Sequence, residues 1–126
     1  MCMDGFLLVD KPAGWTSHDV VAKVRSILRK EVGQRVKVGH TGTLDPSATG
    51  LLILVIGGYT KRAGEFSKLD KTYEAELTLG ATSSTGDIEG EIMPKSPKKP
   101  TQEAVEAVLS MFLGQIEQTP HPIQCC

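Results

Sequence analysis

Aromatic side chains are scarce in this sequence: tryptophan, tyrosine and phenylalanine together make up 5% of its 126 residues. The apolar share of 40% is still enough for one hydrophobic core, which suits a chain of this length. No apolar run approaches the roughly 18 to 20 residues of a membrane-spanning helix, and strand-like sequence begins almost at the first residue, which leaves no signal peptide. We therefore expect one cytoplasmic domain.

Cysteine is also rare, and its positions exclude the usual metal and disulfide scaffolds. Cys2, Cys125 and Cys126 lie near the two ends, none of them forms a C-x-x-C pair, and the three histidines are widely separated. A structural zinc site needs closely spaced thiols and imidazoles, so we expect reduced thiols and no metal.

The net charge is low, but the two halves of the chain differ in the sign of their charge. The whole chain carries −1, yet residues 1–73 contain 11 Lys or Arg and 7 Asp or Glu, a balance of +4, whereas residues 74–126 contain 3 and 8, a balance of −5. A phosphate backbone would lie favourably over the first half, although charges placed only for solubility would give the same count.

Hydrophobic periodicity predicts two strands and a helix in the first half of the chain. The short apolar runs 5–10 and 51–56 are typical of strands, and the second is uninterrupted. Between them, Ser17 is a candidate N-cap, with Asp19 in the first helical turn. The helix has an apolar face formed by Val20, Val21, Val24, Ile27, Leu28 and Val32, and a basic face formed by Lys23, Arg25, Arg29 and Lys30. A basic face of this kind is more often solvated than bound to RNA.

The second half gives weaker patterns. A short helix is expected within 59–69, a strand over the alternating residues 71–81, an edge strand over 91–93, and a helix from the N-cap Thr101 to a stop at Gly114. The buried face of this last helix should comprise Val105, Val108, Leu109, Phe112 and Leu113. The order of elements predicts a mixed α and β domain of the α+β class.

A loop rich in glycine and threonine, GHTGTLDPSATG, precedes the second apolar run and carries Asp45. Pro46 biases Asp45 towards extended backbone angles, and the glycines allow close approach of a ligand. A carboxylate in such a loop can act in catalysis, although Asp before Pro is also common turn chemistry.

The string GHTGTLDPSATGLL resembles the catalytic motif of the TruB family of pseudouridine synthases. Two further strings in the family's order support this: DKPAGWTS at 10–17 resembles the upstream motif, and KTYEA at 71–75 resembles the tyrosine motif, followed by LG and TGD. The segment SATGLL at 47–52 looks more like the stand-alone bacterial type than the guide-RNA-dependent branch of archaea and eukaryotes.

The resemblance implies a pseudouridine synthase fold, a mixed and largely antiparallel sheet flanked by helices and incomplete at the C-terminus. It implies an isomerase that converts uridine to pseudouridine in the T-arm (position 55) of transfer RNA, without cofactor or metal. Asp45 matches the catalytic aspartate, acting as nucleophile or as general base. The target uridine must be flipped out of the folded arm before it can react.

Substrate-binding roles also follow from the resemblance. Tyr73 matches the tyrosine that lies against the target base, His40 the residue that approaches the displaced bases, and Lys11 a loop residue with a structural or RNA-contacting role. The other implied substrate-binding residues are Gly42, Thr43, Lys61 and Asp87. By residue type alone, Tyr73 would be a core residue, His40 a loop histidine bonded to its own backbone, and Lys11 a solvated turn lysine.

The resemblance covers nearly all of this chain but about half of a family catalytic domain. It extends over 1–120 and leaves 121–126 as a divergent tail, and the family's arginine partner for the aspartate belongs to the unmatched half. We expect a monomer that binds transfer RNA, has no membrane segment and is nearly inactive by itself. A non-catalytic RNA-binding or tRNA-folding protein is the alternative, and an acid-dependent hydrolase is disfavoured because the motif has no second carboxylate.

Overall fold

The computed structural model describes residues 3–119, and the chain divides into two compact units, Met1–Thr72 and Tyr73–Cys126. The first unit contains β1 (Gly5–Lys11), α1 (Ser17–Val32), β2 (Val38–His40), β3 (Gly50–Ile56), the 3-10 helix η1 (Gly57–Arg62) and α2 (Ala63–Ser67). The second contains β4 (Ala81–Ser83), β5 (Ile92–Pro94), α3 (Gln102–Leu109) and the 3-10 helix η2 (Ser110–Phe112). The mixed α and β class is confirmed. Cys2, Cys125, Cys126 and the tail 121–126 lie outside the described residues.

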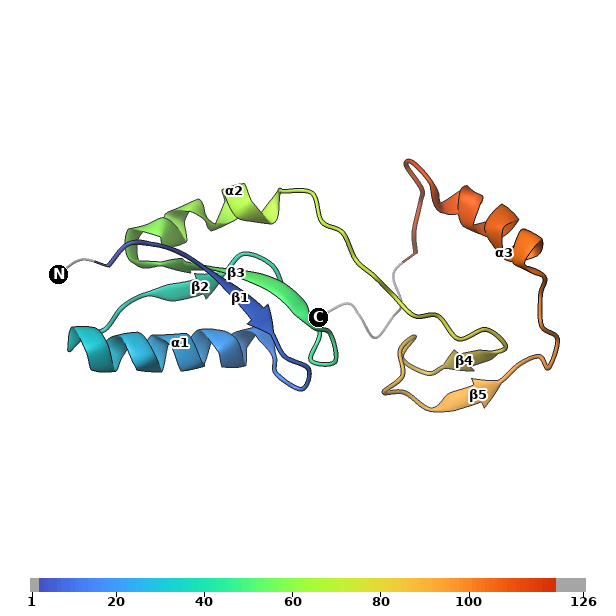
Figure 1. Cartoon of the computed structure of the whole chain (residues 1–126), viewed down its shortest axis with the longest axis horizontal. Helices are drawn as coiled ribbons and strands as arrows, with labels where there is room; N and C mark the ends of the chain where they lie inside the picture. Colours follow the sequence, from blue (N-terminus) through green and yellow to red (C-terminus); the bar gives the residue numbers. More distant parts are fainter. Residues whose placement is uncertain (1–2, 120–126) are drawn as a thin grey trace. The chain divides into compact units, whose positions relative to one another are not determined.

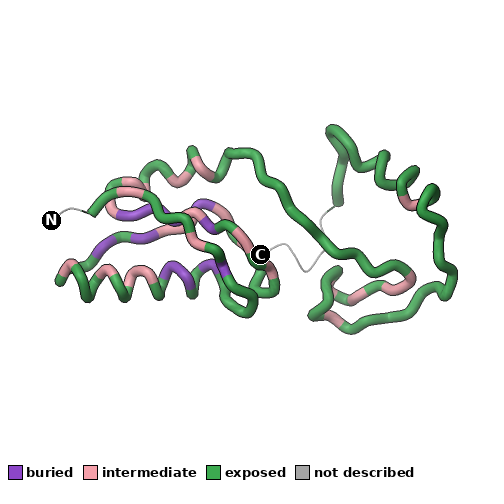
Figure 2. The backbone as a smooth tube through the Cα atoms, in the orientation of Figure 1, coloured by how far each residue is buried: buried purple, intermediate pink, exposed green. Residues whose placement is uncertain are grey.

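A three-stranded antiparallel sheet with the order β1-β3-β2 forms the centre of the first unit (Figure 1). The predicted strands 5–10 and 51–56 are confirmed, and each is one residue longer than predicted. Helix α1 lies along one face of this sheet, where five buried side chains form the core: Val20, Val21, Val38, Leu52 and Leu54. Figure 2 shows that the buried residues belong to this unit.

Helix α1 begins one residue earlier than its sequence suggests. Thr16, and not Ser17, is the N-cap: the Asp19 amide donates to Thr16 Oγ1 at 3.0 Å, and the Thr16 amide donates to Asp19 Oδ2 at 2.9 Å. These bonds favour the ionised carboxyl and hold the pKa of Asp19 below its usual value. The helix ends at Gly33, whose φ of 72° is in the left-handed region, and whose amide donates to the Arg29 carbonyl oxygen.

The short helix expected within 59–69 is present as η1 followed by α2. An aromatic cluster joins these helices to the sheet: the Phe6 ring centroid on β1 is 6.4 Å from that of Tyr59 and 5.5 Å from that of Phe66. This cluster concentrates several of the few aromatic rings at one end of β1, where they pack together at favourable distances.

The second unit differs from its predicted structure. β4 and β5 form a two-stranded antiparallel sheet close to the predicted edge strand, but residues 71–79 contain no strand, and the strand predicted over 71–81 is therefore wrong except at its end. A strand needs a partner for its backbone hydrogen bonds, and the described chain provides none for this segment.

Helix α3 has its predicted N-cap, since Thr101 Oγ1 accepts from the Ala104 amide at 3.2 Å. The prediction of a buried face is wrong: Val105 is partly buried, and the remaining apolar residues of that face are exposed. No residue between 73 and 119 is buried (Figure 2). Within residues 3–119, no helix is long and apolar enough to cross a membrane.

We expect Thr16→Ala to lower the unfolding free energy by about 1 kcal/mol, because it removes the cap that positions α1 against the core. Urea unfolding followed by far-UV circular dichroism measures this. The matched control is Thr101→Ala, which removes the same kind of cap from α3, a helix with no buried residue. If both variants lose the same amount of unfolding free energy, the cap of α1 does not stabilise the core as proposed.

Candidate active site

Asp45 lies at the surface, in the loop of residues 41–49 that connects β2 to β3. Its backbone carbonyl oxygen accepts a hydrogen bond from the Ala48 amide at 3.0 Å, which closes a tight turn just after the acid. Its carboxylate has no hydrogen bond or ion pair with any residue of the described range 3–119. The acid is therefore free to meet a substrate or a partner group from outside this part of the chain.

The residue before the acid is fixed from α1. Leu44 packs against the core, and Ser17 Oγ both accepts from the Leu44 amide at 2.9 Å and donates to the Leu44 carbonyl oxygen at 3.2 Å. Ser17 is buried, so these two bonds are shielded from water. The loop start is fixed from β3, because the amide and the Oγ1 of Thr41 each donate to the Ile53 carbonyl oxygen at 3.0 Å.

The residue after the acid is fixed from the loop that follows β1. The Gly14 amide donates to the Pro46 carbonyl oxygen at 2.7 Å, and Lys11 Nζ donates to the same oxygen at 3.2 Å. Lys11 Nζ also donates to the carbonyl oxygens of Pro12 at 3.0 Å and Trp15 at 2.5 Å. Gly14 has a φ of 83°, in the region that favours glycine. The two motifs, residues 10–17 and 39–52, thus form one hydrogen-bonded assembly around Asp45.

Lys11 is completely buried, and its amino group bonds three carbonyl oxygens. The prediction of a direct substrate contact does not agree with this geometry, since no part of the side chain reaches the surface. Of the two roles predicted, the structure supports the structural one: Lys11 holds the loop that carries Asp45.

Three other predicted site residues lie in the same loop region. His40 ends β2, and its Nδ1 is enclosed without a hydrogen-bond partner among the described residues. Gly42 is partly buried and Thr43 is exposed. A Cβ at Gly42 would lie 4.0 Å from Lys71 Cε, so a larger residue there would meet this side chain. The backbone bond expected for an ordinary loop histidine is not formed by His40 Nδ1.

The remaining predicted residues lie elsewhere. Lys61 is exposed on η1 of the first unit. Tyr73 and Asp87 belong to the second unit, so their proximity to Asp45 stays a prediction. Tyr73 is 69% exposed and is not a core residue. Asp87 accepts from Thr85 Oγ1 at 2.6 Å, and this bond, together with the Glu89 amide, holds the pKa of the Asp87 carboxyl below its usual value.

The sequence does not reveal the contacts that Ser17 and Gly14 make with the loop. Both belong to the motif at 10–17, but a hydrogen bond between residues about thirty positions apart has no periodic signal. Trp15 is 40% exposed, so the tryptophan of this motif is not part of the core. Only its backbone takes part in the assembly, through the Lys11 bond.

We expect Lys11→Met to leave the carbonyl oxygens of Pro12 and Trp15 without their donor, whereas Pro46 keeps the Gly14 amide. The unfolding free energy should fall by about 1 to 3 kcal/mol for each oxygen that stays buried and unpaired. Hydrogen exchange should show faster exchange at the Gly14 and Leu44 amides, which connect the two motifs. Lys30→Met, an exposed change on α1, is the control. If Lys11→Met does not fold, Ser17→Ala tests the same assembly by removing the Leu44 contacts. Unchanged exchange at Gly14 and Leu44 in a folded variant would contradict this role.

Comparison with known proteins identifies the family of this chain. The family model described as TruB family pseudouridylate synthase (N terminal domain) matches residues 26–125. A protein named tRNA pseudouridine synthase B from Cupriavidus taiwanensis is 48% identical over 116 residues, covering 92% of this chain and 35% of the relative. Proteins of the same name from Thermobifida fusca and Geobacillus kaustophilus are each 47% identical, and the match covers 39% and 40% of their lengths.

The chain therefore spans less than half the length of the relatives that it matches. The family match nevertheless extends over most of the chain, including Asp45 and the strand that follows it. On this evidence, the chain belongs to the TruB family of pseudouridylate synthases and corresponds to its N-terminal domain.

Proposed function

We propose that this chain is the N-terminal catalytic part of a transfer RNA pseudouridine synthase that acts on a uridine of the T-arm, with Asp45 as the catalytic aspartate. One observation carries the assignment of the acid: Asp45 is exposed and unpaired, whereas both of its neighbours are fixed by hydrogen bonds from the first motif. The names of the relatives support the reaction and the substrate class. Since transfer RNA is the proposed substrate, we place the reaction in the cytoplasm.

The proposed reaction needs one well-placed carboxylate. The bond between C1′ of the ribose and N1 of uracil breaks, the base turns over, and C1′ forms a bond to C5. N1 gains a proton and C5 loses one, so no atom other than hydrogen is exchanged and the chemistry demands no redox cofactor. Asp45 serves as nucleophile or as general base, and in either role a rigid loop lowers the entropic cost of reaching the reactive geometry.

The loop that carries Asp45 is suited to catalysis because it is held on both sides of the acid. The turn closed by Asp45 and Ala48 directs the acid outwards, while Leu44 and the Pro46 carbonyl remain tied to the sheet and to α1. The described residues give the carboxylate no cationic partner. We propose that the arginine implied by the family resemblance supplies this partner from outside the described residues, through a charge-assisted hydrogen bond.

RNA binding is the second part of the proposal. The flipped uridine would lie near Asp45, with His40, Gly42 and Thr43 in the same loop region, and the phosphate backbone would follow the positive charge of the first unit. We propose Tyr73, Lys61 and Asp87 as further substrate contacts on the basis of their motif positions. A monomer is sufficient for this arrangement.

We expect Asp45→Asn to reduce pseudouridine formation about 100- to 10,000-fold, because an amide cannot act as a nucleophile or a base. Tritium release from a T-arm hairpin labelled at C5 of uridine measures turnover. The assay compares the 126-residue chain with the same chain extended by the remaining sequence of the Geobacillus kaustophilus relative. We expect little release from the chain alone, because none of residues 3–119 gives Asp45 a cationic partner.

Asp70→Asn is the matched control, since it removes an exposed carboxylate from the same unit. Release that requires Asp45 but not Asp70 would support the proposed function. If neither the 126-residue chain nor its extended form releases tritium, and the hairpin still binds, a non-catalytic RNA-binding protein would be favoured.

A further inference from the structure

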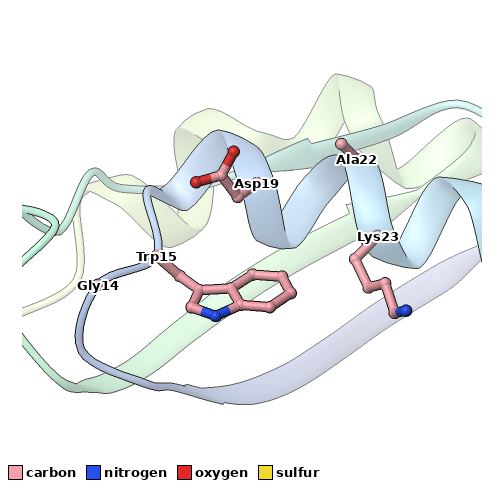
Figure 3. A pocket seen from close by; sticks show the side chains of 5 residues that line it. All are labelled: Gly14, Trp15, Asp19, Ala22 and Lys23. Atoms are coloured by element: carbon pink, nitrogen blue, oxygen red, sulfur yellow. The ribbon is translucent and has the colours of Figure 1, made fainter.

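A surface groove of about 370 Å³ lies beside the first turns of α1, next to the assembly that holds Asp45. Its lining residues are Gly14, Trp15, Asp19, Ala22 and Lys23. In Figure 3 the indole of Trp15 extends from the loop along the helix towards Lys23. The groove is shallow and open to solvent, so a ligand there would lie against the surface and would not be enclosed.

Trp15 is the one tryptophan of the chain, and the fold does not use its side chain in the core. Its backbone is nevertheless fixed, since its carbonyl oxygen accepts from the buried Lys11 Nζ. The Trp15 ring is 40% exposed, so it contributes less hydrophobic stabilisation than a buried ring would. The fixed backbone limits where the ring can lie, which lowers the ordering cost of binding a planar ligand.

The charges around the groove favour a phosphate at its Lys23 end. Lys23 is exposed and has no hydrogen bond or ion pair to any described residue, and two more exposed basic residues, Arg29 and Lys30, follow on the same helix. Asp19 is the opposing charge. Its carboxylate is engaged with the Thr16 amide and points away from the indole (Figure 3).

The groove adjoins the loop that carries Asp45 through one hydrogen bond. Gly14, which lines the groove, donates its amide hydrogen to the carbonyl oxygen of Pro46, the residue directly after Asp45. The groove and the acid are therefore held by the same hydrogen-bonded assembly.

We propose that this groove binds a nucleotide of single-stranded RNA other than the target uridine, with its base stacked on Trp15 and a phosphate paired with Lys23. Every base has a π-face and every nucleotide a phosphate, so the groove would add affinity with little sequence preference. The proposal rests on the proposed function for RNA as the ligand class, and it adds a binding site separate from that of the reacting base.

The lone tryptophan makes the groove directly observable. We expect oligouridylate to quench the fluorescence of Trp15, because a stacked base deactivates the excited indole. Fluorescence anisotropy of a fluorescein-labelled oligouridylate measures affinity independently of the indole. Trp15→Leu should weaken binding about 5- to 150-fold, the change that corresponds to about 1–3 kcal/mol of base stacking.

Lys23→Gln should reduce the slope of log affinity against log salt concentration by about 0.7, the loss of one phosphate contact on a single strand. Lys30→Gln changes the charge by the same amount on the same helix outside the groove, and it should leave the quenching intact. Thermal unfolding checks that each variant keeps its fold.

Three results would overturn the proposal. Oligouridylate does not bind, it binds without quenching the fluorescence of Trp15, or it binds equally well to the Trp15→Leu variant. The same holds if the Trp15 emission of the extended chain, obtained by difference from its Trp15→Leu variant, is blue-shifted and unchanged by oligouridylate, because protein would then cover the groove. Asp45→Asn separates the two ideas: quenching should persist in this variant while tritium release is lost. Release that depends on Asp45 without any quenching would overturn the groove alone.

Discussion

The buried amino group of Lys11 is the contact on which the rest of the site depends. It lies at the end of β1, completely excluded from water, and donates to the carbonyl oxygens of Pro12, Trp15 and Pro46. An amino group in this position has a high desolvation cost unless its donors are all used. The three carbonyl oxygens offset that cost, and in doing so they join the loop after β1 to the loop that carries Asp45.

The loop around the acid is therefore rigid on each side of an exposed residue. Ser17 fixes Leu44 and the pair Gly14 and Lys11 fixes Pro46, so the freedom left at Asp45 is mainly that of its side chain. Thr16 and Asp19 cap α1 and leave Ser17 available for this contact. Burial of the supporting residues beneath an exposed acid is the arrangement expected of a preorganised catalytic loop.

The two units show how strongly a core depends on a second layer. In the first unit α1 covers the sheet, and the shared apolar residues become buried. In the second unit the β4–β5 sheet and α3 each have apolar residues, yet none of residues 73–119 is buried. The alternating segment 71–79 likewise forms no strand, because backbone groups need a partner strand and alternation alone supplies none.

The sequence by itself determined the class of fold, the strands β1 and β3, the helix α1, the loop with Asp45 and the family, because local periodicity and a contiguous motif carry these features. It did not determine which threonine or serine caps α1, that Lys11 is buried, or that Trp15 is exposed. Those outcomes depend on contacts such as the bond between Lys11 and Pro46, which form only when segments far apart in the sequence pack together. Burial is decided by what covers a residue, and only the tertiary structure provides that cover.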